Sequence, residues 1–249
     1  MAKESWLQRL HVKPLIARIQ IEFLCGINEF IYCNTLHFFL AKNTNTAGAI
    51  VKWFKQTLCQ FELEAEKHGG RNAYDILNEQ ASKIPAGSND LIVLPYFMEE
   101  RAPIWNSDAK GTIIGLSLAH TKAHLYRAFL EAVAYSLRNA MDATGENVGN
   151  AIYIAGGVTK SKVWRQIFAD VTGYPVICPL HDVEANMGDV ILAGIGTGLL
   201  SYGDVKKWQV LDEKILPNPE NHEKYNACYQ VYQSAYQHVN YPPLINLTV

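Results

Sequence analysis

Two adjacent glycines, Gly156 and Gly157, follow the apolar run AIYIA and precede a segment with helical periodicity. Because glycine has no Cβ, a flat heterocycle or a phosphate can lie against the main chain at such a point. The N-terminus of the next helix offers unpaired N–H groups and a positive dipole end, and Ser161 can cap that helix or contact a ligand. The pattern fits a nucleotide or phosphate site, and it equally fits a tight strand-to-helix turn without a ligand.

Three other groups of residues are weaker candidates. The sequence GIGTG at 194–198 resembles a glycine-rich phosphate loop, but it continues a helix-like apolar run, so we interpret it as close helix packing. His120 and His124 can share a helix face, yet there is no HExxH pattern or obvious third ligand, so we expect cap and surface residues rather than metal ligands. The charged residues at 99–101 fit a charged site or a solvated loop, and composition favours the loop.

The elements that must position these residues alternate between strands and helices. The glycine pair lies in a predicted β-α-β unit: a buried strand ending in AGG, a helix over 161–172 with Gly173 as its stop, and a strand in YPVICP. The clearest helix follows Thr121, its expected N-cap, and carries one apolar stripe. Further expected elements are a strand or hairpin from Ile31, helices over 47–59 and 72–83, a buried strand over 91–94, and helices over 185–200 and 220–238. The helix over 47–59 is expected to bury Trp53, and the fold class is α/β.

Composition limits the classes of partner. The 249 residues are 49% hydrophobic and 18% charged, which suits a globular protein of one or two domains. A net charge of -2 disfavours nucleic acid and anionic membranes as partners. The five cysteines are scattered without a CxxC pair, which indicates reduced thiols, and no apolar run is long enough for a signal or membrane segment. We therefore expect a cytoplasmic protein.

Three segments in chain order resemble the FGGY family of carbohydrate kinases, and within it the xylulokinase and gluconate kinase members. LPYFMEERAPIWNSDAKGTIIGLSLAHTKAHLYRAFLEAVAYSLRN resembles the central signature of that family. IAGGVTKSKVWRQIFADVTGYPV resembles its adenosine motif with the next helix and strand, and TAGAIVKWF resembles a third segment on the nucleotide side. Three ordered matches over most of 32 to about 200 are far more specific than any single motif.

The resemblance implies an RNase H-like domain of the actin, Hsp70 and hexokinase group, the C-terminal lobe of a two-lobe sugar kinase. This domain would span 31–240, with an unassigned segment over 1–30 and a tail over 241–249. The implied activity is ATP-dependent phosphorylation of a sugar or polyol hydroxyl, with a xylulose-like or gluconate-like substrate. Mg²⁺ would be held through the phosphates of ATP.

The resemblance also assigns roles to individual residues. Gly157 and Ser161 would lie against adenine, and Gly156 would shape the turn. Gly48 and Lys52 would face the phosphate and ribose side. Lys52 replaces the neutral residue that some relatives carry, and a lysine near phosphates is electrostatically sensible.

The family's first lobe supplies the aspartate base, a phosphate hairpin and most of the sugar pocket, and no equivalent is evident here. We therefore expect no catalytic residue in this chain, inactivity when it is alone, and sugar contacts made mainly by the missing lobe. Glu100, Arg101 and Trp105 would order the loop beneath the cleft. Two alternatives stay open: a non-catalytic module on a kinase scaffold that binds nucleotide or a partner, with a possible homodimer through the exposed cleft face, and an inert folded remnant.

Overall fold

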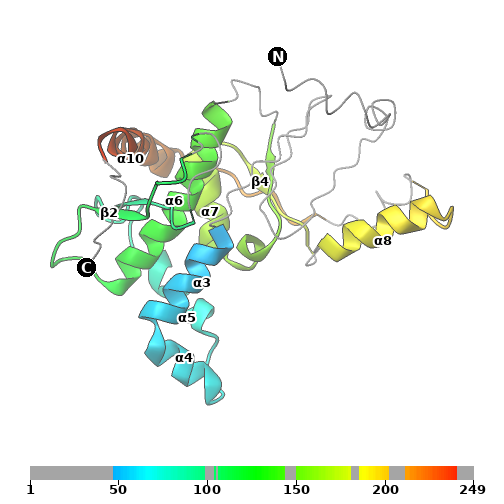
Figure 1. Cartoon of the computed structure of the whole chain (residues 1–249), viewed down its shortest axis with the longest axis horizontal. Coiled ribbons are helices and arrows are strands. Elements are labelled where there is room, and N and C mark those ends of the chain that lie inside the picture. The colour runs from blue at the N-terminus through cyan, green and yellow to red at the C-terminus, as the bar shows by residue number, and fades with distance from the viewer. Residues whose placement is uncertain are drawn as a thin grey trace, which may run out of the picture.

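A computed structural model describes residues 47–98, 104, 106–143, 150–180, 185–201 and 211–239, with the backbone alone described for 185–188. Helix α6 (Lys122–Asp142) lies at the centre, with α3, α5, α7, α10 and β1 packed against it (Figure 1). Every residue from 126 to 137 is buried, although the sequence predicts one apolar stripe. The predicted stripe is buried, and burial extends to the other sides of the helix because neighbouring elements cover them and small alanines let them approach.

Helix α3 (Ala47–Leu58) confirms the first predicted helix and corrects one detail. Its buried residues are Ala47, Ile50, Val51 and Phe54. The prediction that Trp53 is buried was wrong, since 39% of this residue is exposed. At 100° per residue, Trp53 lies roughly 100° around the helix from the centre of the buried face, so its ring contacts Phe97 and Phe129 at the border of the core while part of it stays exposed.

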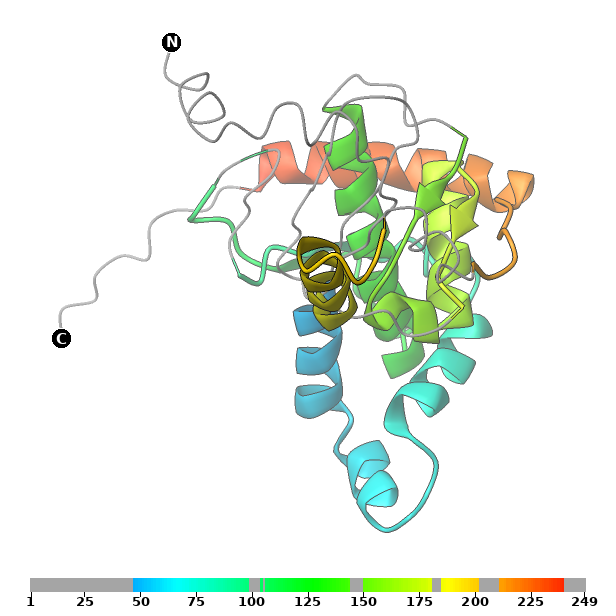
Figure 2. The ribbon, with the colours of Figure 1, turned by 90° about the vertical axis from the view of Figure 1, so that its right-hand side faces the viewer.

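Helix α5 (Ala73–Ser82) confirms the predicted helix over 72–83, and the side chain of Asn72 caps it by accepting a hydrogen bond from the N–H of Tyr74. The preceding helix α4 (Gln60–Lys67) was not predicted. It has no buried residue, so it lacks the apolar stripe by which an amphipathic helix is recognised. Both views place α4 at the far end of the projection that α3, α4 and α5 form (Figures 1 and 2).

The described strands form two small sheets. β1 (Ile92–Leu94) pairs antiparallel with β2 (Thr112–Ile114) in the register Val93 opposite Ile113, and β1 is fully buried as predicted. β3 (Ile152–Tyr153) pairs parallel with β4 (Val176–Ile177), with Ile152 opposite Val176. Helix α7 (Lys162–Thr172) joins these two strands and ends at Gly173, whose φ is +75°. The predicted β-α-β unit and the mixed helix and sheet class are confirmed.

Helices α8 (Ala185–Gly196) and α10 (Pro219–His238) confirm the last predicted pair. The glycines of GIGTG end α8: the N–H groups of Leu199 and Leu200 both donate to the carbonyl of Gly194, and the Leu200 side chain fills the space where a Cβ of Gly194 would be. The helical course of this run is confirmed as far as Gly196, but the predicted close helix packing is not shown, since the residue that meets Gly194 is Leu200 of the same segment. No helix in the described part of the chain is long and apolar enough to cross a membrane.

Several predictions fall outside the described residues. They concern the strand or hairpin from Ile31, the segments 1–30 and 241–249, and the loop residues Glu99, Glu100, Arg101 and Trp105.

Candidate functional site

The turn that contains the two glycines is held by the β3–β4 pairing. The N–H of Ile154 donates to the carbonyl of Ile177 at 3.0 Å, and Ile154 and Ala155 are buried. The chain then emerges at Gly156 and forms a short 3₁₀ helix, η1 (Gly157–Lys160), before α7 begins. The sheet thus fixes where the exposed glycines lie.

Gly156 and Gly157 are glycines for different reasons. Gly156 has φ +86° and ψ −159°, a conformation that is essentially restricted to glycine. Its carbonyl accepts hydrogen bonds from the N–H and the hydroxyl of Thr159, at 3.0 and 2.7 Å. Gly157 has no positive φ, and a Cβ built on it would meet nothing within 4 Å. The fold therefore requires glycine at 156, whereas at 157 it leaves an open, exposed stretch of backbone.

Ser161 joins this turn to the core. Its Oγ accepts the N–H of Trp164 at 3.2 Å, which makes it the N-cap of α7, and its hydroxyl donates to Oδ1 of Asn78 at 2.9 Å. The same Asn78 oxygen accepts a hydrogen bond from the hydroxyl of Tyr126. Sequence reasoning missed Asn78, because nothing local indicates that a residue 83 positions away would meet Ser161. The contact of Ser161 with adenine stays a prediction.

Positive charge gathers where the turn enters α7. Lys160 and Lys162 are exposed on either side of Ser161, and the helix N-terminus adds the positive end of its dipole. Arg165 pairs with Asp212 through Nη1 and Oδ2 at 2.6 Å, and this hydrogen bond holds the pKa of Asp212 below its ordinary value. Lys160 and Lys162 thus lie close in sequence to the exposed glycine backbone, and Lys162 also contributes to the low pKa of Asp212.

Gly48 and Lys52 lie on α3, one turn apart on its exposed side. A Cβ on Gly48 would meet nothing within 4 Å. In the described part of the chain, no hydrogen bond or ion pair connects either residue to 154–161. The structure thus brings Gly156, Gly157 and Ser161 together, and it places Gly48 and Lys52 on a separate helix.

His124 caps α6 together with Thr121, as predicted, and His120 fastens the segment just before the helix. Nδ1 of His124 accepts the N–H of Thr121 at 3.2 Å, and Nδ1 of His120 accepts the N–H of Ser117 at 2.9 Å. Both rings also reach Asn89 through their Nε2 atoms at 3.0 Å. Among the described residues, no group of three or more His, Cys, Asp or Glu side chains is placed to hold a metal ion.

Comparison with known proteins identifies relatives over most of the chain. The model of the FGGY family of carbohydrate kinases, C-terminal domain, matches residues 27–197. The chain is 33% identical to a gluconokinase of Bacillus licheniformis over 70% of its own length and 35% of the relative's. It is 35% identical to a xylulose kinase of Staphylococcus epidermidis over 78% of its own length and 38% of the relative's.

The folds agree as well. The crystal structure of gluconate kinase from Lactobacillus acidophilus superimposes with a TM-score of 0.68 at 27% identity, covering 83% of this chain and 42% of the other. In each of these comparisons the chain spans well under half of the related protein. The likeness concerns the C-terminal part of such proteins.

Proposed function

Because the chain belongs to the FGGY family of carbohydrate kinases, we propose that it forms the nucleotide-binding C-terminal lobe, of RNase H-like fold, of an ATP-dependent sugar kinase. The observation that carries this proposal is the exposed backbone at Gly157, with free space where a side chain would be. A purine can lie flat against such a surface. The xylulose kinase and gluconokinase relatives favour a sugar or sugar acid as phosphate acceptor.

In this proposal each site residue has a defined part. Gly156 turns the chain out of the sheet, and the backbone of Gly157 lies against adenine with Ser161 at its edge. Gly48 and Lys52 face the ribose and phosphates, where the ammonium group of Lys52 offsets negative charge. The exposed glycine at Gly48 lets a ligand approach the helix backbone closely.

We propose that phosphoryl transfer itself needs a second lobe. The γ-phosphoryl group would pass from ATP to a sugar hydroxyl, giving ADP and a sugar phosphate, while a base takes the hydroxyl proton. Such transfer depends on in-line positioning of acceptor and donor, with Mg²⁺ carried by the nucleotide phosphates. We assign the base and most sugar contacts to the part of the related kinases with which this chain does not align.

Calorimetric titration with ATP and ADP in the presence of Mg²⁺ tests the nucleotide assignment. Gly157→Trp fills the open space with an indole and should weaken binding by roughly tenfold or more. Gly196→Trp is the matched control, because Gly196 is exposed and equally open but lies on α8. If wild type and Gly157→Trp bind alike, or if both variants lose binding to the same extent, the assignment to Gly157 is wrong.

Gly157→Ala provides a gentler version of the same experiment. It adds one methyl group where the fold tolerates one, so the midpoint of thermal unfolding should stay the same or rise. Nucleotide affinity should nevertheless fall.

A coupled assay of ADP release with D-xylulose and with gluconate tests the need for a second lobe, since turnover at ordinary kinase rates by this chain alone would refute it.

A further inference from the structure

One side-chain oxygen joins three helices at the end of the glycine turn. Asn78 lies on α5, and its Oδ1 accepts the hydroxyl of Ser161, the N-cap of α7, at 2.9 Å. The same oxygen accepts the hydroxyl of Tyr126, which lies on α6, at 3.3 Å. Asn78 is half-buried, whereas Ser161 and Tyr126 are buried. The start of α7 is therefore tied through one amide to both α5 and α6.

The direction of both hydrogen bonds follows from the state of the two hydroxyl groups. Oγ of Ser161 accepts the N–H of Trp164 at 3.2 Å, so its one proton is available for Asn78. Burial raises the pKa of the Tyr126 hydroxyl above its ordinary value, so this group also keeps a proton to donate. Both partners therefore need an acceptor at position 78, and an apolar side chain there would leave two buried hydroxyl groups unpaired.

The glycine turn is held by different contacts at its two ends. At the sheet end, the N–H of Ile154 donates to the carbonyl of Ile177. At the helix end, the side chain of Ser161 reaches Asn78 on another helix. Between these two anchors the backbone of Gly157 is exposed, with nothing within 4 Å of the position of a Cβ. A binding surface made of exposed backbone depends on such supporting contacts to keep one conformation.

We propose that Asn78 is a positioning residue of the nucleotide site: it accepts the hydroxyl of Ser161 and thereby holds the turn in the conformation that leaves the Gly157 backbone open to a purine. This role rests on the proposed function, because it concerns the same turn. Asn78 acts through Ser161 and needs no contact with the nucleotide. If loss of the bond leaves the open conformation populated by only about 10–20%, the apparent Kd rises by about five- to tenfold.

Calorimetric titration of the whole chain with ADP and Mg²⁺ tests this role. Asn78→Leu removes the acceptor at similar volume and should raise the Kd by about five- to tenfold. Asn78→Asp keeps an oxygen that can accept both hydroxyl groups, so its Kd should stay within about twofold of wild type. Asn78→Ala removes the acceptor with less apolar bulk, and it replaces Asn78→Leu in the comparison if circular dichroism shows that the leucine variant does not fold.

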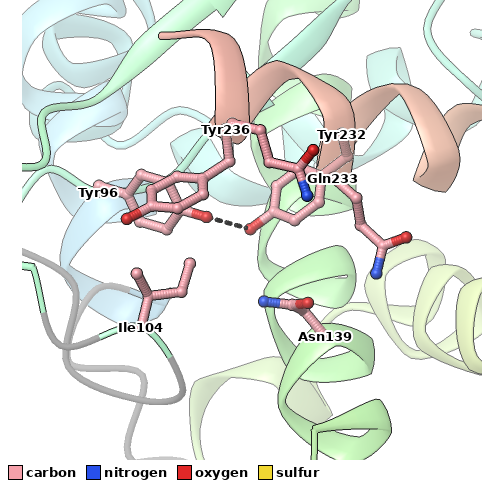
Figure 3. Close-up of a pocket in the computed structure, with 7 residues that line it drawn as sticks. Tyr96, Ile104, Asn139, Tyr232, Gln233 and Tyr236 are labelled. Carbon is pink, nitrogen blue, oxygen red and sulfur yellow. Dashed lines mark hydrogen bonds between the residues drawn. The ribbon is translucent and has the colours of Figure 1, made fainter. Parts of the chain in front are cut away.

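Asn139→Leu is the matched control. Asn139 is also a half-buried asparagine on a helix, but it lies near the end of α6 and lines a cavity together with Tyr96 and Tyr232 (Figure 3). The hydroxyl groups of these two tyrosines bond each other at 3.0 Å. Within the described residues no hydrogen bond joins the Asn139 side chain to Ser161. The same exchange of side chains at this position should therefore leave the Kd for ADP within about twofold of wild type.

Action through Ser161 gives a readout that a merely structural role would not move. Ser161→Ala breaks the same bond from the other side, so Asn78→Leu should cause no further loss of ADP affinity in that background. Hydrogen exchange without nucleotide provides a second readout. The backbone amides of 156–160 should exchange faster in Asn78→Leu than in wild type or in Asn139→Leu, because the turn opens more often.

The role of Asn78 is supported by a raised Kd for Asn78→Leu that Asn78→Asp restores, together with the loss of its effect in the Ser161→Ala background. It is overturned if Asn78→Leu binds ADP like wild type, if Asn78→Asp binds no better than Asn78→Leu, or if Asn139→Leu weakens binding equally. Losses that add in the Asn78→Leu/Ser161→Ala double variant also overturn it. A wild-type chain that binds no ADP overturns the proposed function and this role with it, whereas binding that Asn78→Leu leaves intact overturns this role alone.

Discussion

Replacement of Glu131 tests how the interior of the fold is held together. Glu131 is 1% exposed, and its two carboxylate oxygens accept four hydrogen bonds. Oε1 receives the N–H of Gly87 at 3.0 Å, Nε of Arg127 at 2.8 Å and the hydroxyl of Tyr225 at 2.7 Å. Oε2 receives the hydroxyl of Ser88 at 2.8 Å. One side chain thus joins α6, α10 and the turn before β1.

The loss of folding stability expected for Glu131→Gln follows from these contacts. Glu131→Gln removes the negative charge and leaves the guanidinium of Arg127, 8% exposed, without its counter-ion. Breaking a buried pair on one side destabilises by about 3–5 kcal/mol. The turn that Glu131 holds has positive φ at Ser88, Asn89 and Asp90, between 49° and 68°, so it depends on such contacts to persist. Against a total stability of about 5–15 kcal/mol, the loss would be severe.

Urea denaturation followed by circular dichroism measures this free energy. Arg127→Met leaves the carboxylate unpaired, and the Glu131→Gln/Arg127→Met double variant removes both charges. The double variant should lose less free energy of unfolding than the two single variants lose together, by about 1–3 kcal/mol, because the two charges are coupled. A loss below about 1 kcal/mol for Glu131→Gln, or additivity within about 0.5 kcal/mol in the cycle, would refute the argument.

Three further changes have defined outcomes. Gly156→Ala should lower stability by about 1–3 kcal/mol in thermal or urea unfolding because of its φ of +86°, whereas Gly48→Ala on the exposed face of α3 should not lower it. Burial raises the pKa of Cys59 to about 11, so about a thousandth of this thiol is ionised at pH 8; peptide mapping should find it alkylated slowly in the native chain and rapidly in guanidinium. The hydrogen bond from Arg165 lowers the pKa of Asp212 from its ordinary value of 3.8. The stabilisation of the folded state by this pair is therefore present above pH 3.8, and it is lost as the pH falls through the lower pKa that Asp212 has in the folded chain. Arg165→Met should therefore be less stable than wild type in urea at pH 7, and the difference should shrink near about pH 2; an equal difference at both pH values would contradict the pairing.

The β-α-β unit could be predicted because its signals are local. Ser161 caps α7, Gly173 ends it in the left-handed conformation, and a short apolar run lies on each side. Each signal acts within a few residues, so the local sequence is enough to predict the element. The same holds for Asn72 at the start of α5.

The errors and omissions have non-local causes. Trp53 has the spacing of a core residue, and its exposure depends on which neighbours cover α3. Arg127 and Glu131 look like a surface pair four residues apart on a helix, and they are buried because α10 and the turn at 87–90 close over them. Spacing along one helix does not reveal which side of it a distant segment will cover.

The glycine pair shows where fold and function separate. Gly156 is explained by its backbone angles, so its presence alone fits a ligand-free turn as well as a binding site. Gly157 is not explained in this way: alanine would fit its backbone and its surroundings, and would reduce the entropy lost on folding. Gly48 is similar, since it lies exposed in the first turn of α3, where alanine would also be accommodated and no neighbour demands glycine. Two glycines that the fold does not need, on segments that resemble the nucleotide side of a kinase family, support the proposal that a ligand approaches the backbone closely there.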